Sequence, residues 1–155
     1  MNVSEQVIRE LIKQALMEKL GGCGCENAAL ETVPGDFVKK KAKSGVLVVK
    51  GDTVKTERFE VDGVSLKDVT TLQESPNMGP GYMELDHAAL EWTLTYDEVD
   101  VVLEGTLQIE TDGQIVTAHV GDMIFIPKNT HIHFQTPDKT RYVYIAYPAN
   151  WSELI

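Results

Sequence analysis

One acidic residue, Glu98, stands at a fixed spacing from two glycines and is the first candidate for chemistry in this sequence. Six residues separate it from Gly105, and fifteen more lead to Gly121, where the run G-D-M-I-F-I-P begins. A carboxylate aimed into an apolar interior is costly unless a cation, a metal ion or a hydrogen-bond donor meets it. Its pKa would then be perturbed, as is common at functional sites. Two interpretations of Glu98 stay open: a reactive group, or a structural acid bonded to a nearby tyrosine or backbone group.

Two histidines could add metal chemistry to this acid. His131 and His133 flank Ile132, and strict strand alternation sends both imidazoles to the face opposite Ile132. A metal site built from Glu98, Glu91 and one of the two histidines would need a bulge or a register shift. An isolated histidine pair more often has a structural or surface role. We therefore expect no transition metal.

The elements that must position these residues are short β-strands. From Val46 onward the sequence alternates β-branched or aromatic segments with turn signals such as Asp62-Gly63 and Asp112-Gly113. Such spacing predicts an all-β sandwich or barrel over residues 45–155. The expected strands are 46–49, 64–72, 82–85, 90–95, 99–103, 107–110, 115–119, 123–126, 132–134 and 142–147.

The N-terminal part of the sequence is different. Apolar residues at helical spacing predict an amphipathic helix within residues 1–20, with its apolar stripe over 3–20, ended by Gly21 and Gly22. Residues 21–44 are predicted to be a linker and an irregular segment. Cys23 and Cys25 lie in that linker, and we interpret them as two reduced thiols, because C-x-C rarely reaches a relaxed disulfide geometry.

Composition excludes several classes of function. The net charge of −10 argues against nucleic acid binding, which needs a basic face. Without a run of eighteen apolar residues we expect no transmembrane helix, and charged residues interrupt any secretory signal. The mixed charges of the helix disfavour membrane binding. We expect a cytoplasmic protein.

The spacing around Glu98 resembles the paired signatures of the cupin β-barrel, a double-stranded β-helix or jelly roll. Glu98 and Gly105 match the Glu and the Gly of the first signature. The two metal-binding histidines of that signature precede its Glu by a gap of four or three residues. A gap of four puts Glu91 and Thr93 at the histidine positions, and a gap of three puts Trp92 and Leu94 there. In the second signature the histidine position reads Ile132. The resemblance therefore implies a cupin fold without the usual metal ligands.

Three blocks narrow the resemblance to the ethanolamine utilisation protein EutQ family. They are W-T-L-T-Y-D-E-V-D-V-V-L-E-G, G-D-M-I-F-I-P-K-N and Y-I-A-Y-P-A-N-W, in this order between residues 92 and 151. The resemblance implies a homodimeric cupin of the ethanolamine bacterial microcompartment with acetate kinase activity. That activity interconverts acetyl phosphate and ADP with acetate and ATP, and Mg²⁺ would accompany the nucleotide.

On this interpretation Glu98 and Tyr96 are the candidate catalytic residues. Trp92, Lys128 and Arg141 are the candidate substrate-binding residues, with the aromatic ring lining the barrel mouth and the two cations contacting anions. Core packing and solvated loop charges are the alternatives. Residues 3–20 would dock to shell or cargo proteins, or pack on the barrel or on a partner. A non-catalytic assembly factor and a cupin with a rearranged metal site remain alternative functions.

Overall fold

The computed structural model describes residues 29–154 of the chain. The chain divides into two compact units, Met1–Glu31 and Thr32–Ile155, and nearly all described residues belong to the second. The helix and the two thiols predicted before residue 29 lie outside the described residues. Among residues 29–154, no helix is long and apolar enough to cross a membrane.

Three short strands form a small sheet in the order β1-β2-β3. Their bounds are Glu31–Val33, Lys39–Lys41 and Leu47–Val49, and β2 pairs with β3 in antiparallel register. The third strand was expected from the sequence, whereas the first two lie in the segment predicted to be irregular. A 3₁₀ turn, η1 (Gly51–Thr53), follows.

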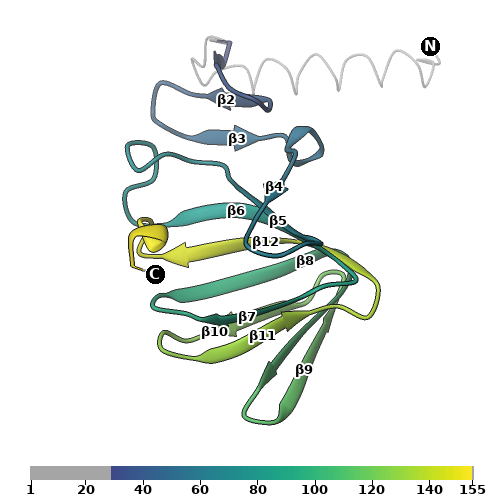
Figure 1. Ribbon diagram of the computed structural model, residues 1–155. Helices are drawn as coiled ribbons and strands as arrows, with labels where there is room; N and C mark the ends of the chain where they lie inside the picture. The colour runs from purple at the N-terminus through teal and green to yellow at the C-terminus, as the bar shows by residue number, and fades with distance from the viewer. Residues whose placement is uncertain (1–28, 155) are drawn as a thin grey trace, which may run out of the picture. The chain divides into compact units, whose positions relative to one another are not determined.

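The remaining nine strands form one curled sheet. Its path is β4-β5-β6-β12-β8-β11-β7, and β9 and β10 also pair with β8 (Figure 1). A second 3₁₀ turn, η2 (Trp151–Glu153), closes the described chain. The strands are β4 Glu57–Arg58, β5 Val64–Asp68, β6 Gly79–Asp86, β7 Ala89–Thr93, β8 Asp97–Thr111, β9 Gln114–His119, β10 Met123–Ile126, β11 His131–Gln135 and β12 Lys139–Tyr147.

The long strand β8 connects two parts of this sheet. Its first half pairs with β10 and β12, and its second half pairs with β9 and β11. Gly105 lies between the halves with φ +71°, a left-handed conformation that favours glycine. A Cβ atom there would collide with the backbone carbonyl oxygen of Lys139. The two strands predicted at 99–103 and 107–110 are thus one strand that changes partners at this glycine.

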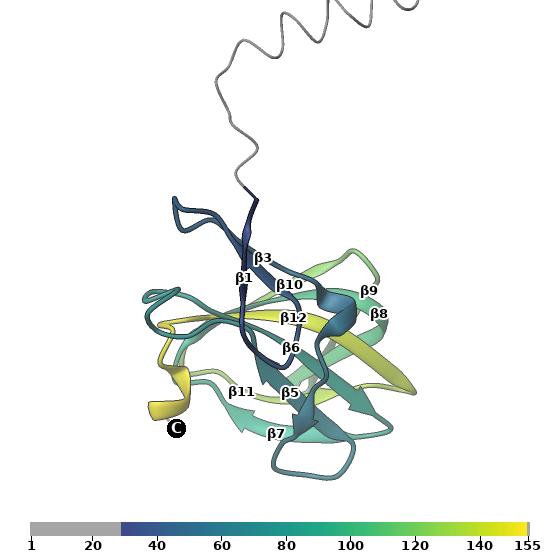
Figure 2. The ribbon, with the colours of Figure 1, turned by 90° about the horizontal axis from the view of Figure 1, so that it is seen from above.

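The core lies inside the curl of the sheet (Figure 2). Side chains on β6, β8 and β12 alternate between buried and exposed positions over much of their length, as expected when one face of an antiparallel sheet covers a core. Leu85, Leu94 and Leu107 are completely buried there. This alternation decides which polar residues of β8 enter the interior.

Candidate functional site: a buried acid pair in the barrel interior

Two carboxyl groups enter the core from strand β8. Glu98 and Asp100 are two residues apart, so both side chains point to the same face of the sheet. They are only 6% and 0% exposed. Glu98 lies opposite Ile126 of β10 and Ala146 of β12, and Asp100 lies two pairs further along, opposite Ile124 and Tyr144. The interior therefore holds an acid pair rather than the single acid expected from the sequence.

Burial determines the protonation of this pair. It raises the pKa of Glu98 from 4.5 to about 8. Burial, together with the charge of Glu98, also raises the pKa of Asp100 well above its ordinary value. Burial therefore favours the protonated form of both acids, and a protonated carboxyl can donate a hydrogen bond through its proton.

Asp100 has donor and acceptor capacity to spare. Among the described residues, no group other than the neighbouring Glu98 carboxyl engages either carboxyl oxygen of Asp100, and none meets the hydroxyl of Tyr142 in hydrogen-bond geometry. Burial also raises the pKa of Tyr142, so its hydroxyl stays protonated. Buried polar groups are almost always hydrogen-bonded, and the exceptions often mark a site that takes a water molecule or a ligand.

A cavity of about 20 Å³ lies beside Glu98. It is bordered by Trp92, Tyr96 and Tyr144 and by apolar side chains, among which are Phe59, Leu66, Met83 and Leu90. The indole N–H of Trp92 donates to the hydroxyl of Tyr96 over 3.2 Å. This volume is enough for about one water molecule. The predicted residues Trp92, Tyr96 and Glu98 do line one common cavity, but that cavity is small.

Tyr144 is a further member of this site that was not among the candidate residues of the sequence. Its hydroxyl donates to the Asp68 carboxylate over 2.6 Å, and the indole N–H of Trp151 donates to the same oxygen over 3.3 Å. Burial, followed by the charge of Asp68, raises the pKa of Tyr144. Asp68 thereby fixes two aromatic walls of the cavity.

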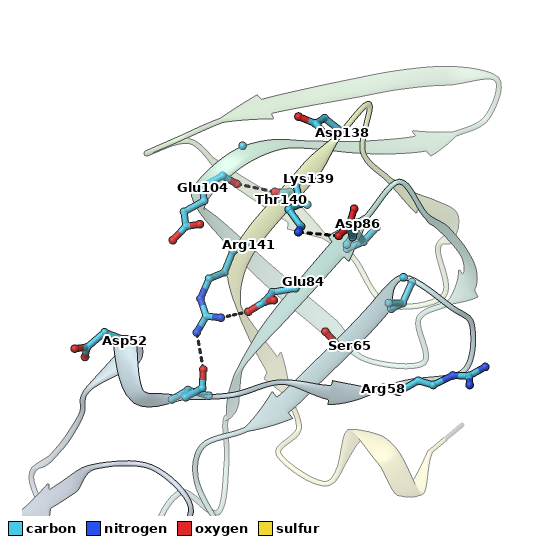
Figure 3. A pocket seen from close by; sticks show the side chains of 15 residues that line it. Asp52, Arg58, Ser65, Glu84, Asp86, Glu104, Asp138, Lys139, Thr140 and Arg141 are labelled. Atoms are coloured by element: carbon cyan, nitrogen blue, oxygen red, sulfur yellow. Dashed lines mark hydrogen bonds and ion pairs between the residues drawn. The ribbon is translucent and has the colours of Figure 1, made fainter.

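The two predicted anion-binding cations lie elsewhere. Lys128 is exposed, and its backbone N–H donates to the Asp97 carboxylate over 2.8 Å. Arg141 pairs with Glu84 (Figure 3) and donates to the carbonyl oxygens of Gly51 and Val54 at 3.0 and 3.1 Å. Its guanidinium also lies over the ring of Tyr82. Neither cation lines the cavity beside Glu98. Arg141 ties the segment around η1 to the barrel.

Arg141 also borders the largest groove of the described chain. Its volume of about 960 Å³ is of a size suited to a small-molecule ligand. Its lining, however, combines five carboxylates with three cations, and each cation forms an ion pair. The carboxylate of Glu104 points away from these pairs in Figure 3. Such a groove repels a bare phosphate chain.

The metal candidates of the sequence are divided between two faces of the sheet. Trp92, Leu94 and Ile132 point toward the interior, where Leu94 and Ile132 are 0% and 1% exposed. Glu91, His131 and His133 therefore lie on the outer face, away from Glu98. A site that joins Glu98 with these residues is excluded by this arrangement, whereas Glu91 and the two histidines are close to one another.

Known proteins resemble this chain over nearly its whole length. The model of the family described as "Ethanolamine utilisation protein EutQ" matches residues 3–153. A protein of Clostridioides difficile named "Acetate kinase EutQ" is 41% identical, over 97% of this chain and 96% of the relative. A Salmonella typhimurium protein of the same name is 38% identical over 97% of this chain, which spans 65% of that longer protein.

Solved structures give the same picture. The structure of the Clostridium difficile EutQ protein superposes with a TM-score of 0.73 at 44% identity, covering 77% of this chain and all of that one. A RmlC-like cupin from Shewanella frigidimarina superposes with a TM-score of 0.56 at 17% identity, covering 67% of this chain and 92% of the other. The second likeness concerns the fold alone. Together they confirm the predicted cupin fold.

Proposed function

We propose a function for this chain on the basis of its family. The chain belongs to the ethanolamine utilisation protein EutQ family. On that basis we propose that it is an acetate kinase of ethanolamine catabolism. The observation that carries the proposal is the name shared by three relatives, which are 36–41% identical to this chain over 97% of its length. The barrel interior supplies a chemical reason for an acyl substrate.

The acid pair suits an acetyl group. A protonated Glu98 can donate to carboxyl or acyl oxygens, and the apolar wall of the cavity suits a methyl group. An ionised acid pair would instead repel acetate. We therefore assign Glu98, which lines the cavity, the role of a hydrogen-bond donor to the acetyl oxygen, while Asp100 lies beside Glu98 and does not line the cavity.

The proposed step needs no proton transfer. A β-phosphate oxygen of ADP attacks the phosphorus of acetyl phosphate, the bond between that phosphorus and the acyl oxygen breaks, and acetate leaves as ATP forms. Negative charge develops on the departing acetate oxygens. A donor already aimed at those oxygens stabilises that charge, which is the usual basis of phosphoryl-transfer catalysis. The reverse reaction consumes acetate and ATP along the same path.

Substrate entry requires the cavity to widen. Its volume of about 20 Å³ admits a water molecule, whereas acetate has four heavy atoms. Phe59 and Trp92 are only partly buried, and their rings contact each other with centroids 5.5 Å apart. We propose that this pair moves to admit the acyl group.

The nucleotide is proposed to bind as its magnesium complex. The acidic lining of the large groove disfavours free phosphate, and the cations there are already paired. A nucleotide that carries Mg²⁺ has less negative charge for the protein to neutralise. Mg²⁺ is thus part of the substrate in this proposal.

The test measures acetyl phosphate formation from acetate and Mg–ATP with three purified variants. Glu98→Leu removes the donor at similar size, and we expect kcat/KM to fall by about 10²-fold or more. Glu98→Gln keeps an N–H donor and is expected to retain part of the activity. Asp112→Asn changes an exposed acid in the turn after the same strand, outside both the cavity and the groove, and serves as the matched control.

The pH profile of the wild-type enzyme provides a second readout. Because the pKa of Glu98 is about 8, kcat/KM for acetate should fall as pH rises past that value. Full activity of folded Glu98→Leu would refute the role of Glu98. Absence of any turnover in the wild-type protein, with Mg–ATP and acetate in excess, would refute the kinase proposal itself.

An exposed apolar face favours a second function, that of an assembly factor. Leu103, Met123, Phe125 and Tyr147 are 40–68% exposed on neighbouring strands β8, β10 and β12. Surface patches of this kind often mark an interface. We propose a homodimer contact there and association with microcompartment shell or cargo proteins through residues 3–20. Fusing residues 1–20 to a fluorescent reporter tests the latter: a diffuse signal in cells carrying the shell argues against it.

A further inference from the structure

Glu91, His131 and His133 form a compact cluster on the outer face of the sheet. The two histidines are alternate residues of β11, so their imidazoles share one face. Strand β7 pairs with β11 so that Glu91 lies directly opposite His133. Nε2 of His131 lies 3.3 Å from one carboxylate oxygen of Glu91, and Nε2 of His133 lies 3.9 Å from the other.

These distances agree with a shared metal ion. Zinc binds imidazole nitrogen and carboxylate oxygen at about 2.0–2.2 Å, so two such ligands of a tetrahedral ion lie about 3.3 Å apart. One ligand atom from each of the three residues already falls within 4.8 Å of the others. The cluster needs only small side-chain rotations to converge on one ion, and exposed side chains make them readily.

The second nitrogen of each imidazole has its own partner. Nδ1 of His131 lies 3.0 Å from the hydroxyl oxygen of Thr93, and Nδ1 of His133 lies 3.4 Å from a carboxylate oxygen of Glu110. Histidines that bind metals usually engage their other nitrogen in this way, which fixes the ring and its tautomer. A histidine pair that merely decorated the surface would not require a hydroxyl and a second carboxylate at these positions.

We propose that Glu91, His131 and His133 bind one divalent transition metal ion of the zinc, nickel or copper class. Two imidazoles and one carboxylate suit these ions better than Mg²⁺ or Ca²⁺, which prefer oxygen ligands alone. Three protein ligands leave at least one coordination position open. The site is separate from the barrel interior, and it departs from the absence of a transition metal expected from the sequence.

The open position has room for an outside ligand. Two shallow depressions of about 520 and 590 Å³ both include His131 in their lining. A carboxylate, a phosphate or a side chain of another protein could thus reach the ion without moving the backbone. The net charge of −10 further favours cation binding at this surface.

Calorimetric titration of the tag-free full chain with Zn²⁺ tests the proposal. Cys23→Ser and Cys25→Ser are introduced in every variant, because thiols would compete for the ion. We expect one ion per chain. Glu91→Gln, His131→Asn and His133→Asn should each weaken binding by about 10-fold or more, and Glu110→Gln, which acts through His133, by about 10- to 100-fold.

His119→Asn is the matched control. His119 is exposed on β9 of the same sheet and contacts the hydroxyl of Thr106, outside the cluster. Its replacement should leave the affinity unchanged. Copper loading gives an independent readout, since spin-resonance spectra should show two coordinated nitrogens in the parent and one in His133→Asn. Binding of fewer than one ion per chain would overturn the proposal. Equal affinities of the cluster variants and the control would overturn it as well.

Discussion

Replacing Glu98 by Gln should flatten the dependence of stability on pH. In the folded protein the pKa of Glu98 is raised from 4.5 to about 8 by burial. Between pH 4.5 and about pH 8, Glu98 keeps its proton in the folded state and has lost it in the unfolded state. Stability therefore falls as pH rises through this window, by about 1.4 kcal/mol per pH unit for one such group. It levels off above the folded pKa.

The full effect of this shift is about 5 kcal/mol, a large part of the stability of a typical domain. Glutamine has nearly the same shape and cannot ionise, so this contribution disappears in the variant. Asp100 remains and keeps a fall of the same sign, because its pKa is raised as well. From pH 5 to pH 8 we expect the wild-type protein to lose about 4 kcal/mol more stability than Glu98→Gln.

Urea unfolding followed by tryptophan fluorescence provides the measurement. The free energy of unfolding is determined at several pH values between 5 and 8 at constant ionic strength, with the slope against urea checked for constancy. Glu74 does not interfere with this measurement. Its pKa is lowered in the folded protein, so its contribution to the pH dependence of stability lies at more acidic pH. Glu104→Gln, an exposed change on the same strand, should follow the wild-type curve. Parallel curves for the wild type and Glu98→Gln would refute the neutral buried acid.

Three further changes test other parts of the structure. Gly105→Ala should cost about 1–3 kcal/mol more than Gly113→Ala by urea unfolding, because both glycines have positive φ but only at Gly105 does the new Cβ meet a backbone atom. Arg141→Met should cost about 2 kcal/mol and speed proteolysis before Val54, since it removes an ion pair and two bonds to carbonyl oxygens. Phe125→Asp should convert the proposed dimer to a monomer in sedimentation, because it places a charge in the exposed apolar face.

Most strands of the curled sheet were predictable because they are short and strongly patterned. Strand β10 spans the predicted residues 123–126, and β9 begins one residue early. The continuity of β8 was not predictable, because Gly105 interrupts the apolar pattern as a turn would. The two halves of β8 pair with different strands, and only this pairing shows that Gly105 lies at a bend within one continuous strand. Such pairing is a long-range property that a local pattern does not contain.

The candidate site was predictable in part. The match to the cupin signature put Glu98 inside, its neighbours Trp92 and Tyr96 line the same cavity, and residues along a strand alternate between its two faces. The same alternation places Asp100 beside Glu98, so the spacing Glu-x-Asp was a usable signal for the second acid. Tyr144 could not be assigned, because its position depends on the pairing of β12 with β8, some forty residues apart in the chain. The partners of Arg141 are likewise set by tertiary packing.

The register of strand β11 explains both the absence of imidazoles beside Glu98 and the cluster of Glu91, His131 and His133 on the outer face. Ile132 takes the inward position of β11, and it is only 1% exposed. Shifting β11 by one residue would turn His131 and His133 inward and would expose Ile132, whose burial is worth about 2–3 kcal/mol. The interior would then hold imidazoles able to protonate beside Glu98. In the observed register it holds none, so Glu98 has no cationic partner and stays protonated, while the imidazoles meet Glu91 outside.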